Sequence, residues 1–116
     1  MDYRVLRSVA CDHDLSLIFD HLFETYQDLG DAPDEAFARA SARIRSIEDD
    51  MEGLGRVPVQ GTLWPELLPH LRWVTKNRAI FYFQIDEAAA VVCILAAFFG
   101  GQDHRMKMLL RLSDMD

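Results

Sequence analysis

The side chains that could do chemistry in this chain gather late in its sequence. Of its 12 lysines and arginines, six lie after residue 70, and His104 stands among them. These late residues are Arg72, Lys76, Arg78, His104, Arg105, Lys107 and Arg111. Guanidinium and ammonium groups bind phosphates and carboxylates, and an imidazole can carry a proton near neutral pH. If the protein touches a polyanion at all, we expect these residues to make the contact.

Charge is divided unevenly between the two halves of the chain. Residues 1–55 carry a balance of −8 and residues 56–116 a balance of +1, which gives the formal net charge of −7. Because an acidic front half repels phosphate backbones, the sequence disfavours a broad nucleic-acid-binding surface and sequence-specific DNA binding. Within that half, Glu48, Asp49 and Asp50 form an acidic run. It is either a solvated helix face or a docking strip for a basic partner.

Other kinds of site lack their usual sequence patterns. We find no glycine-rich phosphate loop, no catalytic-triad pattern and no metal-ligand spacing, so we expect neither a cofactor nor a metal. Cys11 and Cys93 fall in different elements and are expected to be free thiols. The longest apolar run, 88–99, is too short for a membrane-spanning helix. We therefore expect a cytoplasmic protein that does not contact a membrane.

The first half of the chain is predicted to hold a short strand and two helices. Residues 3–6 alternate as a strand, and Ser8 or Asp12 is expected to cap the helix that follows. Its apolar stripe is Leu15, Ile18, Leu22, Tyr26 and Leu29, and Gly30 ends it. A second helix is expected to start within 31–35, with proline and acids in its first turn. Its stripe is Phe37, Ala40, Ile44, Ile47 and Met51.

The second half is predicted to be mainly a sheet. After a loop that runs through Gly61, Pro65 and Pro69, residues 71–75, 79–85 and 91–99 read as strands, and 105–112 as a short basic helix. Packing the hairpin on the sheet buries the apolar side of both. We therefore predict one domain, 1–116, of class α+β: an N-terminal strand, an antiparallel two-helix hairpin packed on an antiparallel β-sheet, and a short C-terminal helix. The other sheet face is expected to stay open.

The order of elements and the amino-acid sequence of the last strands resemble the RelE/ParE superfamily of type II toxin–antitoxin toxins, most closely its ParE-like plasmid-stabilisation branch. The resemblance covers most of the chain. It rests on Asp14-Leu15, Ile18 and His21-Leu22 in the first helix, on the strands within 71–82, and on the closing segment 94–104. Many members end the last strand with His-Gly-x-Arg-Asp. Here Phe99-Gly100-Gly101-Gln102-Asp103 occupies that place, and His104 and Arg105 follow it.

The resemblance implies a bacterial toxin that a cognate antitoxin holds inactive in a hetero-oligomer of 2:2 or higher order. ParE-like relatives inhibit growth by binding DNA gyrase, with a contribution from the C-terminal segment. The target-binding candidates are therefore His104, Arg105, Lys107 and Arg111. The antitoxin-binding candidates are Arg72, Trp73, Glu48, Asp49 and Asp50.

RelE-like relatives imply a different activity, ribosome-dependent cleavage of mRNA. The catalytic candidates would then be Arg72, Lys76, Arg78, His104 and Arg105. Such cleavage needs a base, an acid and cations around the phosphate. The few cations, the absence of tyrosine after Tyr82 and the acidic net charge favour the gyrase poison over the nuclease. Phe99 and Gln102 keep a third alternative open, a module that only binds its antitoxin.

Several of these candidates also have an ordinary structural explanation. His104 and Arg105 are equally well read as solvated residues that open the last helix. Arg78 is more simply a charge beside a turn, since exposed ion pairs contribute little.

Overall fold

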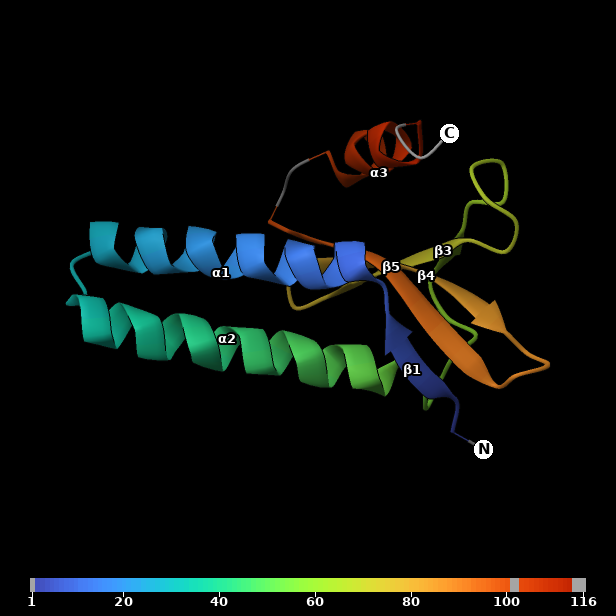
Figure 1. Ribbon diagram of the computed structural model, residues 1–116, viewed down its shortest axis with the longest axis horizontal. Coiled ribbons are helices and arrows are strands. Elements are labelled where there is room, and N and C mark those ends of the chain that lie inside the picture. Colours follow the sequence, from blue (N-terminus) through green and yellow to red (C-terminus); the bar gives the residue numbers. More distant parts are fainter. Residues whose placement is uncertain (1, 101–102, 114–116) are drawn as a thin grey trace.

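Two long helices and a mixed sheet dominate the computed structural model, which describes residues 2–100 and 103–113 (Figure 1). The described elements are β1 (Arg4–Arg7), α1 (Val9–Asp28), α2 (Pro33–Gly53), β2 (Thr62–Leu63), β3 (Arg72–Lys76), β4 (Ala79–Asp86), β5 (Val91–Phe99) and α3 (His104–Ser113). The predicted α+β class and element order are confirmed. One short strand, β2, lies where the sequence predicted only loop. Gln102, which figured in the resemblance, lies outside the described residues.

The five described strands form one sheet in the order β1-β5-β4-β3-β2. The meander from β2 to β5 is antiparallel, as predicted. The first strand instead pairs with β5 in parallel, with Arg4 opposite Val91 and Arg7 opposite Ile94. A parallel neighbour needs a long connection, and here the helical hairpin and the meander supply it. The sheet is therefore mixed at one edge.

Local signals set the ends of the two long helices. Ser8, and not Asp12, is the cap of α1: its Oγ accepts a hydrogen bond from the Cys11 N–H at 3.0 Å. Gly30 follows that helix with φ +111°, a conformation that favours glycine. Pro33 opens α2, with acids in its first turn. Among the described helices, none combines the length and apolarity needed to cross a bilayer.

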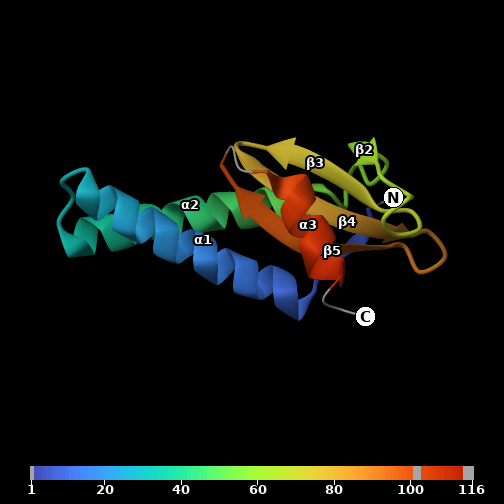
Figure 2. The same cartoon turned by 90° about the horizontal axis from the view of Figure 1, so that it is seen from above.

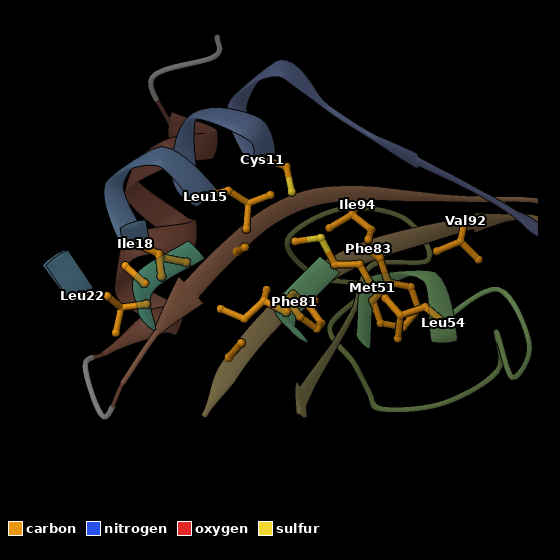
Figure 3. Packing of buried hydrophobic residues seen from close by; sticks show 14 residues of the cluster. Cys11, Leu15, Ile18, Leu22, Met51, Leu54, Phe81, Phe83, Val92 and Ile94 are labelled. Carbon is orange, nitrogen blue, oxygen red and sulfur yellow. The ribbon is translucent and has the colours of Figure 1, made fainter. Parts of the chain in front are cut away.

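The main core lies between the hairpin and one face of the sheet (Figure 3). Its fully buried members include Cys11, Met51, Leu54, Phe81, Phe83, Val92 and Ile94. The predicted stripes account for most of the helical side of this core. Leu29 and Phe37 are the exceptions, with 74% and 55% of their surfaces exposed, because the hairpin projects past the end of the sheet (Figure 1).

The second face of the sheet is covered, contrary to the expectation that it stays open. Helix α3 and the segment 64–71 lie over it, and α3 crosses above β5 in Figure 2. The buried members of this second core are Leu71, Ile80, Tyr82, Ala96, Phe98 and Met108. Side chains alternate across a strand, so the nearly continuous apolar sequence of β4 supplies large groups to both faces. Burial of Tyr82 and Phe98 therefore requires a second covering layer.

Candidate functional site

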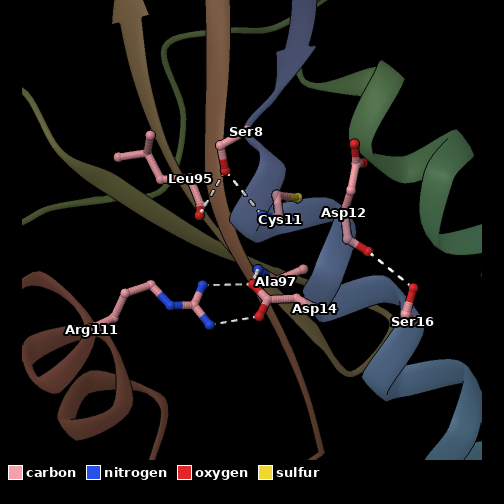
Figure 4. Close-up of polar contacts among 8 residues, drawn as sticks. All are labelled: Ser8, Cys11, Asp12, Asp14, Ser16, Leu95, Ala97 and Arg111. Atoms are coloured by element: carbon pink, nitrogen blue, oxygen red, sulfur yellow. Dashed lines mark hydrogen bonds and ion pairs between the residues drawn. The ribbon is translucent and has the colours of Figure 1, made fainter. Parts of the chain in front are cut away.

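An ion pair between the buried Asp14 and the half-buried Arg111 joins α3 to α1 and β5 (Figure 4). Nη1 and Nη2 of Arg111 donate to Asp14 Oδ2 and Oδ1 at 2.7 and 2.6 Å, and the Ala97 N–H donates to Oδ2 at 2.9 Å. Only 3% of Asp14 is exposed. The hydrogen bond that Arg111 donates to Asp14 raises the pKa of Arg111. The pair thus fixes α3 beside α1.

Sequence reasoning missed this ion pair, although it named both residues for other reasons. Asp14 is a carboxylate among the apolar residues Cys11, Leu15 and Ile18 of one helix face. A charge at such a position is seldom buried without a partner. That signal could have shown that Asp14 needs a cation, although not that Arg111, 97 residues away, provides it.

The N-terminal end of α3 places His104 against aromatic residues of the sheet. His104 Nδ1 lies 2.8 Å from the Tyr82 hydroxyl oxygen, and its ring centroid lies 4.7 Å from that of Trp73. The Arg105 guanidinium stacks over the Trp64 ring, 4.6 Å from the centroid. We call Trp64, Trp73, Tyr82, His104 and Arg105 the aromatic–cation cluster.

Burial shifts the pKa values of two members of this cluster. It lowers the pKa of His104 and raises the pKa of Tyr82 to about 12. At neutral pH the imidazole is therefore uncharged and the phenol keeps its proton. If Tyr82 donates to Nδ1, the imidazole proton lies on Nε2. If Nδ1 donates to Tyr82, Nε2 is left as a proton acceptor.

The five nuclease candidates do not come together. Arg72 and Lys76 stand opposite Phe83 and Ala79, which belong to the core under the helical hairpin. Directly opposed residues of a strand pair share a face. Arg72 and Lys76 therefore lie on the hairpin side of the sheet, whereas His104 and Arg105 lie on the α3 side.

Arg78, the fifth nuclease candidate, lies in the turn between β3 and β4. Asn77 and Arg78 have φ values of +50° and +71°, which fit a two-residue hairpin turn. The Arg78 guanidinium lies 5.9 Å from the Phe99 ring centroid. The position agrees with the simple reading of Arg78 as a turn residue.

The antitoxin-binding candidates also divide between surfaces. Trp73 points to the α3 side of the sheet, away from its neighbour Arg72. In the acidic run, Glu48 accepts from Arg7 Nη1 at 2.6 Å and Asp50 accepts from Asn77 Nδ2 at 3.0 Å. Two of these three acids thus hold β1 and the β3–β4 turn to α2, and Asp49 is exposed.

A groove of about 420 Å³ lies between α1 and α3. Its apolar lining comes from Leu17, Ile18, Ala97, Phe98, Phe99 and Leu110. Its polar lining comes from Asp14, His21, Lys107 and Arg111. Two of the four target-binding candidates, Lys107 and Arg111, therefore border this groove. Within residues 2–100 and 103–113, the groove included, no three His, Cys, Asp or Glu side chains are placed to hold a metal ion.

The fold of this chain is similar to those of solved protein structures. No protein-family model and no curated protein matches the sequence. A chain of the toxin–antitoxin complex RelBE2 from Mycobacterium tuberculosis is 14% identical, with a TM-score of 0.57 over 85% of this chain and 99% of that one. A chain of the chromosomal ParDE toxin–antitoxin system from P. aeruginosa is 20% identical, with a TM-score of 0.63 over 85% of this chain and 97% of that one. The chain therefore has the RelE/ParE fold that its sequence resemblance implied.

Proposed function

We propose that this chain is the toxin of a type II toxin–antitoxin module and forms a single domain over residues 1–116. The observation that supports this proposal most directly is the fold, which aligns with nearly the full length of chains from the RelBE2 and ParDE complexes. Both are described as toxin–antitoxin systems. The partner would be an antitoxin bound in a hetero-oligomer in the cytoplasm.

The proposed mode of action is ParE-like inhibition of growth by binding DNA gyrase. Two features favour binding over RNA cleavage. The nuclease candidates lie on two faces of the sheet, and α3 covers the face that carries the aromatic–cation cluster. The net charge of −7 also opposes docking on ribosomal RNA. In this proposal the cations of α3 contact the target, with Arg111 held to Asp14 so that the helix is presented in one orientation.

Induction in bacterial cells tests the proposed toxin activity. Growth should stop when the chain alone is expressed and should resume when the protein encoded by the neighbouring reading frame is expressed with it. A gyrase poison should also cause filamentation and an SOS response, and the purified chain should inhibit supercoiling by gyrase. Cells that grow normally after induction, with the protein verified as folded, would contradict the toxin proposal.

One observation favours the nuclease as a second candidate, the contact between His104 and Tyr82 beside Arg105. A neutral imidazole at this position could move a proton while an arginine holds phosphate. In that case induction should cause prompt translational arrest with cleaved mRNA, and His104→Gln should abolish the cleavage. Arrest without cleavage would count against this candidate.

A further inference from the structure

The end of the helical hairpin that carries the α1–α2 loop projects beyond the sheet (Figure 2). Phe19 and Phe23 of α1 and Phe37 of α2 pack against one another there, with ring centroids 5.4–6.3 Å apart. Phe19 and Phe23 also pack against the first core, whereas 55% of Phe37 is exposed. We call these three side chains the phenylalanine triad.

The apolar stripe of α2 is only partly covered. Its members Ala40, Ile47 and Met51 are buried, but Phe37, at the same helical spacing, is left half-exposed where the hairpin passes the sheet. Leu29, beside the α1–α2 loop, is exposed as well. Exposed apolar groups gathered at one end of a molecule are more typical of a binding surface than scattered ones are.

The same end of the hairpin is strongly acidic. Residues 19–38 contain six Asp or Glu and no Lys or Arg, a balance of −6 within the net charge of −7. One of the six, Asp31, accepts a hydrogen bond from Arg39 at 2.8 Å. The other five are exposed, namely Asp20, Glu24, Asp28, Asp34 and Glu35.

Three of these acids form a row that helix stability does not explain. Asp20, Glu24 and Asp28 are four residues apart, so the row follows one side of α1 with about 6 Å between successive positions. Like charges at this spacing repel, and a negative charge near the C-terminal end of a helix opposes its dipole. Asp34 and Glu35, in the first turn of α2, are by contrast favourable for that helix. Such departures from local rules are expected at functional surfaces.

The acids and the phenylalanine triad together select the kind of partner. Nucleic acids and anionic bilayers carry the same sign of charge as this end of the hairpin and are repelled by it. A second copy would bring its own acids against these, so pairing of two hairpin ends is disfavoured. A protein surface with lysines or arginines around an apolar hollow satisfies both features, since cations that hold phosphate also bind carboxylates.

A DNA-processing enzyme such as the proposed target holds DNA phosphates with lysines and arginines. We infer that the free end of the hairpin docks on the DNA-binding surface of the target, with the row of carboxylates in the place of phosphates and Phe37 against an apolar part of that surface. This inference rests on the proposed function and names the part of the target that is occupied. Inhibition then follows from competition with DNA, and the cations of α3 contact a different part of the target.

The test uses the full chain, intact gyrase and a fluorescein-labelled DNA duplex as probe. The wild type should inhibit supercoiling and should displace the duplex from gyrase, which fluorescence anisotropy measures. Glu24→Lys reverses the central charge of the row, and Phe37→Ser removes the exposed ring. Each should raise the concentration needed for half-displacement at least about tenfold, as for a central contact. Glu24→Lys should also reduce the dependence of displacement on salt.

Glu52→Lys is the matched control. Glu52 is an exposed glutamate near the C-terminal end of α2, as Glu24 is near that of α1. The substitution changes the net charge by the same amount, so this variant should displace the duplex as the wild type does. Helical circular dichroism during heating reports whether each variant keeps its fold.

Different failures identify different errors. If the wild type inhibits gyrase without displacing the duplex, or if both hairpin variants act as the wild type, this inference is overturned while the proposed function stands. Variants that displace the duplex at wild-type concentrations but no longer bind the protein of the neighbouring reading frame would assign the hairpin end to the antitoxin. Dimers of the chain alone that Phe37→Ser abolishes would assign it to a second copy. A wild type that neither inhibits gyrase nor stops growth would contradict the proposed function itself.

Discussion

Asp14 shows how one side chain determines the position of a whole helix. Its carboxylate lies in the apolar face of α1 and receives three hydrogen bonds, two of them from Arg111 of α3. Asparagine keeps one acceptor oxygen, but it removes the charge and turns an NH2 group toward the donors of the half-buried Arg111 and of Ala97. We expect Asp14→Asn to lower the free energy of unfolding by about 2–3 kcal/mol. This loss is smaller than for a fully buried ion pair, because Arg111 is partly exposed.

Urea unfolding followed by circular dichroism measures the Asp14→Asn effect. Asp20→Asn is the matched control, since Asp20 is an exposed carboxylate on the same helix. Equal midpoints for the two variants would show that the ion pair contributes nothing to stability.

His104 makes the docking of α3 dependent on pH. Burial lowers its pKa in the folded protein below the unfolded value, with Asp103 and Arg105 as the nearby charges that shift it in opposite directions. The unfolded chain therefore binds the proton more readily. The stability that the neutral imidazole contributes is present above about pH 6.5, the usual value for unfolded histidine, and is lost as the pH falls through the lower folded value.

Tryptophan emission measured between pH 7.5 and 5 checks this prediction, because the Trp73 ring packs against the His104 ring. The wild type should show a transition in the acidic part of this range that His104→Gln removes. His13→Gln is the control, since His13 is exposed on α1. An unchanged transition in His104→Gln would assign it to another group.

At the scale of elements, the first strand depends on a close backbone contact at Gly55. The Tyr3 N–H donates to the Gly55 carbonyl at 2.8 Å, and a Cβ on Gly55 would lie 2.3 Å from the Tyr3 carbonyl oxygen. Gly55→Ala should therefore push β1 away from the end of α2. We expect faster amide exchange in β1 and a lower Tm.

Gly53→Ala provides a control two residues earlier. A Cβ there meets only the flexible end of Arg56 at 3.7 Å, and alanine favours a helix more than glycine does. This variant should be at least as stable as the wild type. If both variants have the same Tm, the close approach at Gly55 is not a constraint.

Features that depend on nearby residues were predictable from the sequence, and features that depend on distant partners were not. Both long helices follow from apolar spacing, Pro33 and Gly30, and β3, β4 and β5 follow from short segments rich in β-branched and aromatic residues. The parallel pairing of β1 with β5 and the pairing of Asp14 with Arg111 link opposite ends of the chain. Sequence periodicity describes one element at a time, so it could not place α3 on the second sheet face.

At the scale of the whole molecule, the sheet separates two cores that differ in size. The first lies under the helical hairpin, and the second lies under α3 and contains both tryptophans in partly buried positions. A part of a protein that has its own core can unfold locally. Such local unfolding costs less free energy than unfolding of the whole domain. We therefore expect the α3 side of the sheet to open before the hairpin side.

Two methionines of α3 allow this to be tested with the same substitution. Met108 is fully buried in the second core, whereas Met106 is half exposed on the outer side of α3. Met108→Ala should leave a cavity that costs about 2–4 kcal/mol, so tryptophan emission should change at a lower urea concentration than the helical circular dichroism signal. Met106→Ala should leave the two transitions where they are in the wild type. Coincident transitions in Met108→Ala would mean that the two cores unfold as one unit. The sheet would then transmit the loss of α3 packing to the hairpin, and α3 could not detach while the rest of the fold persists.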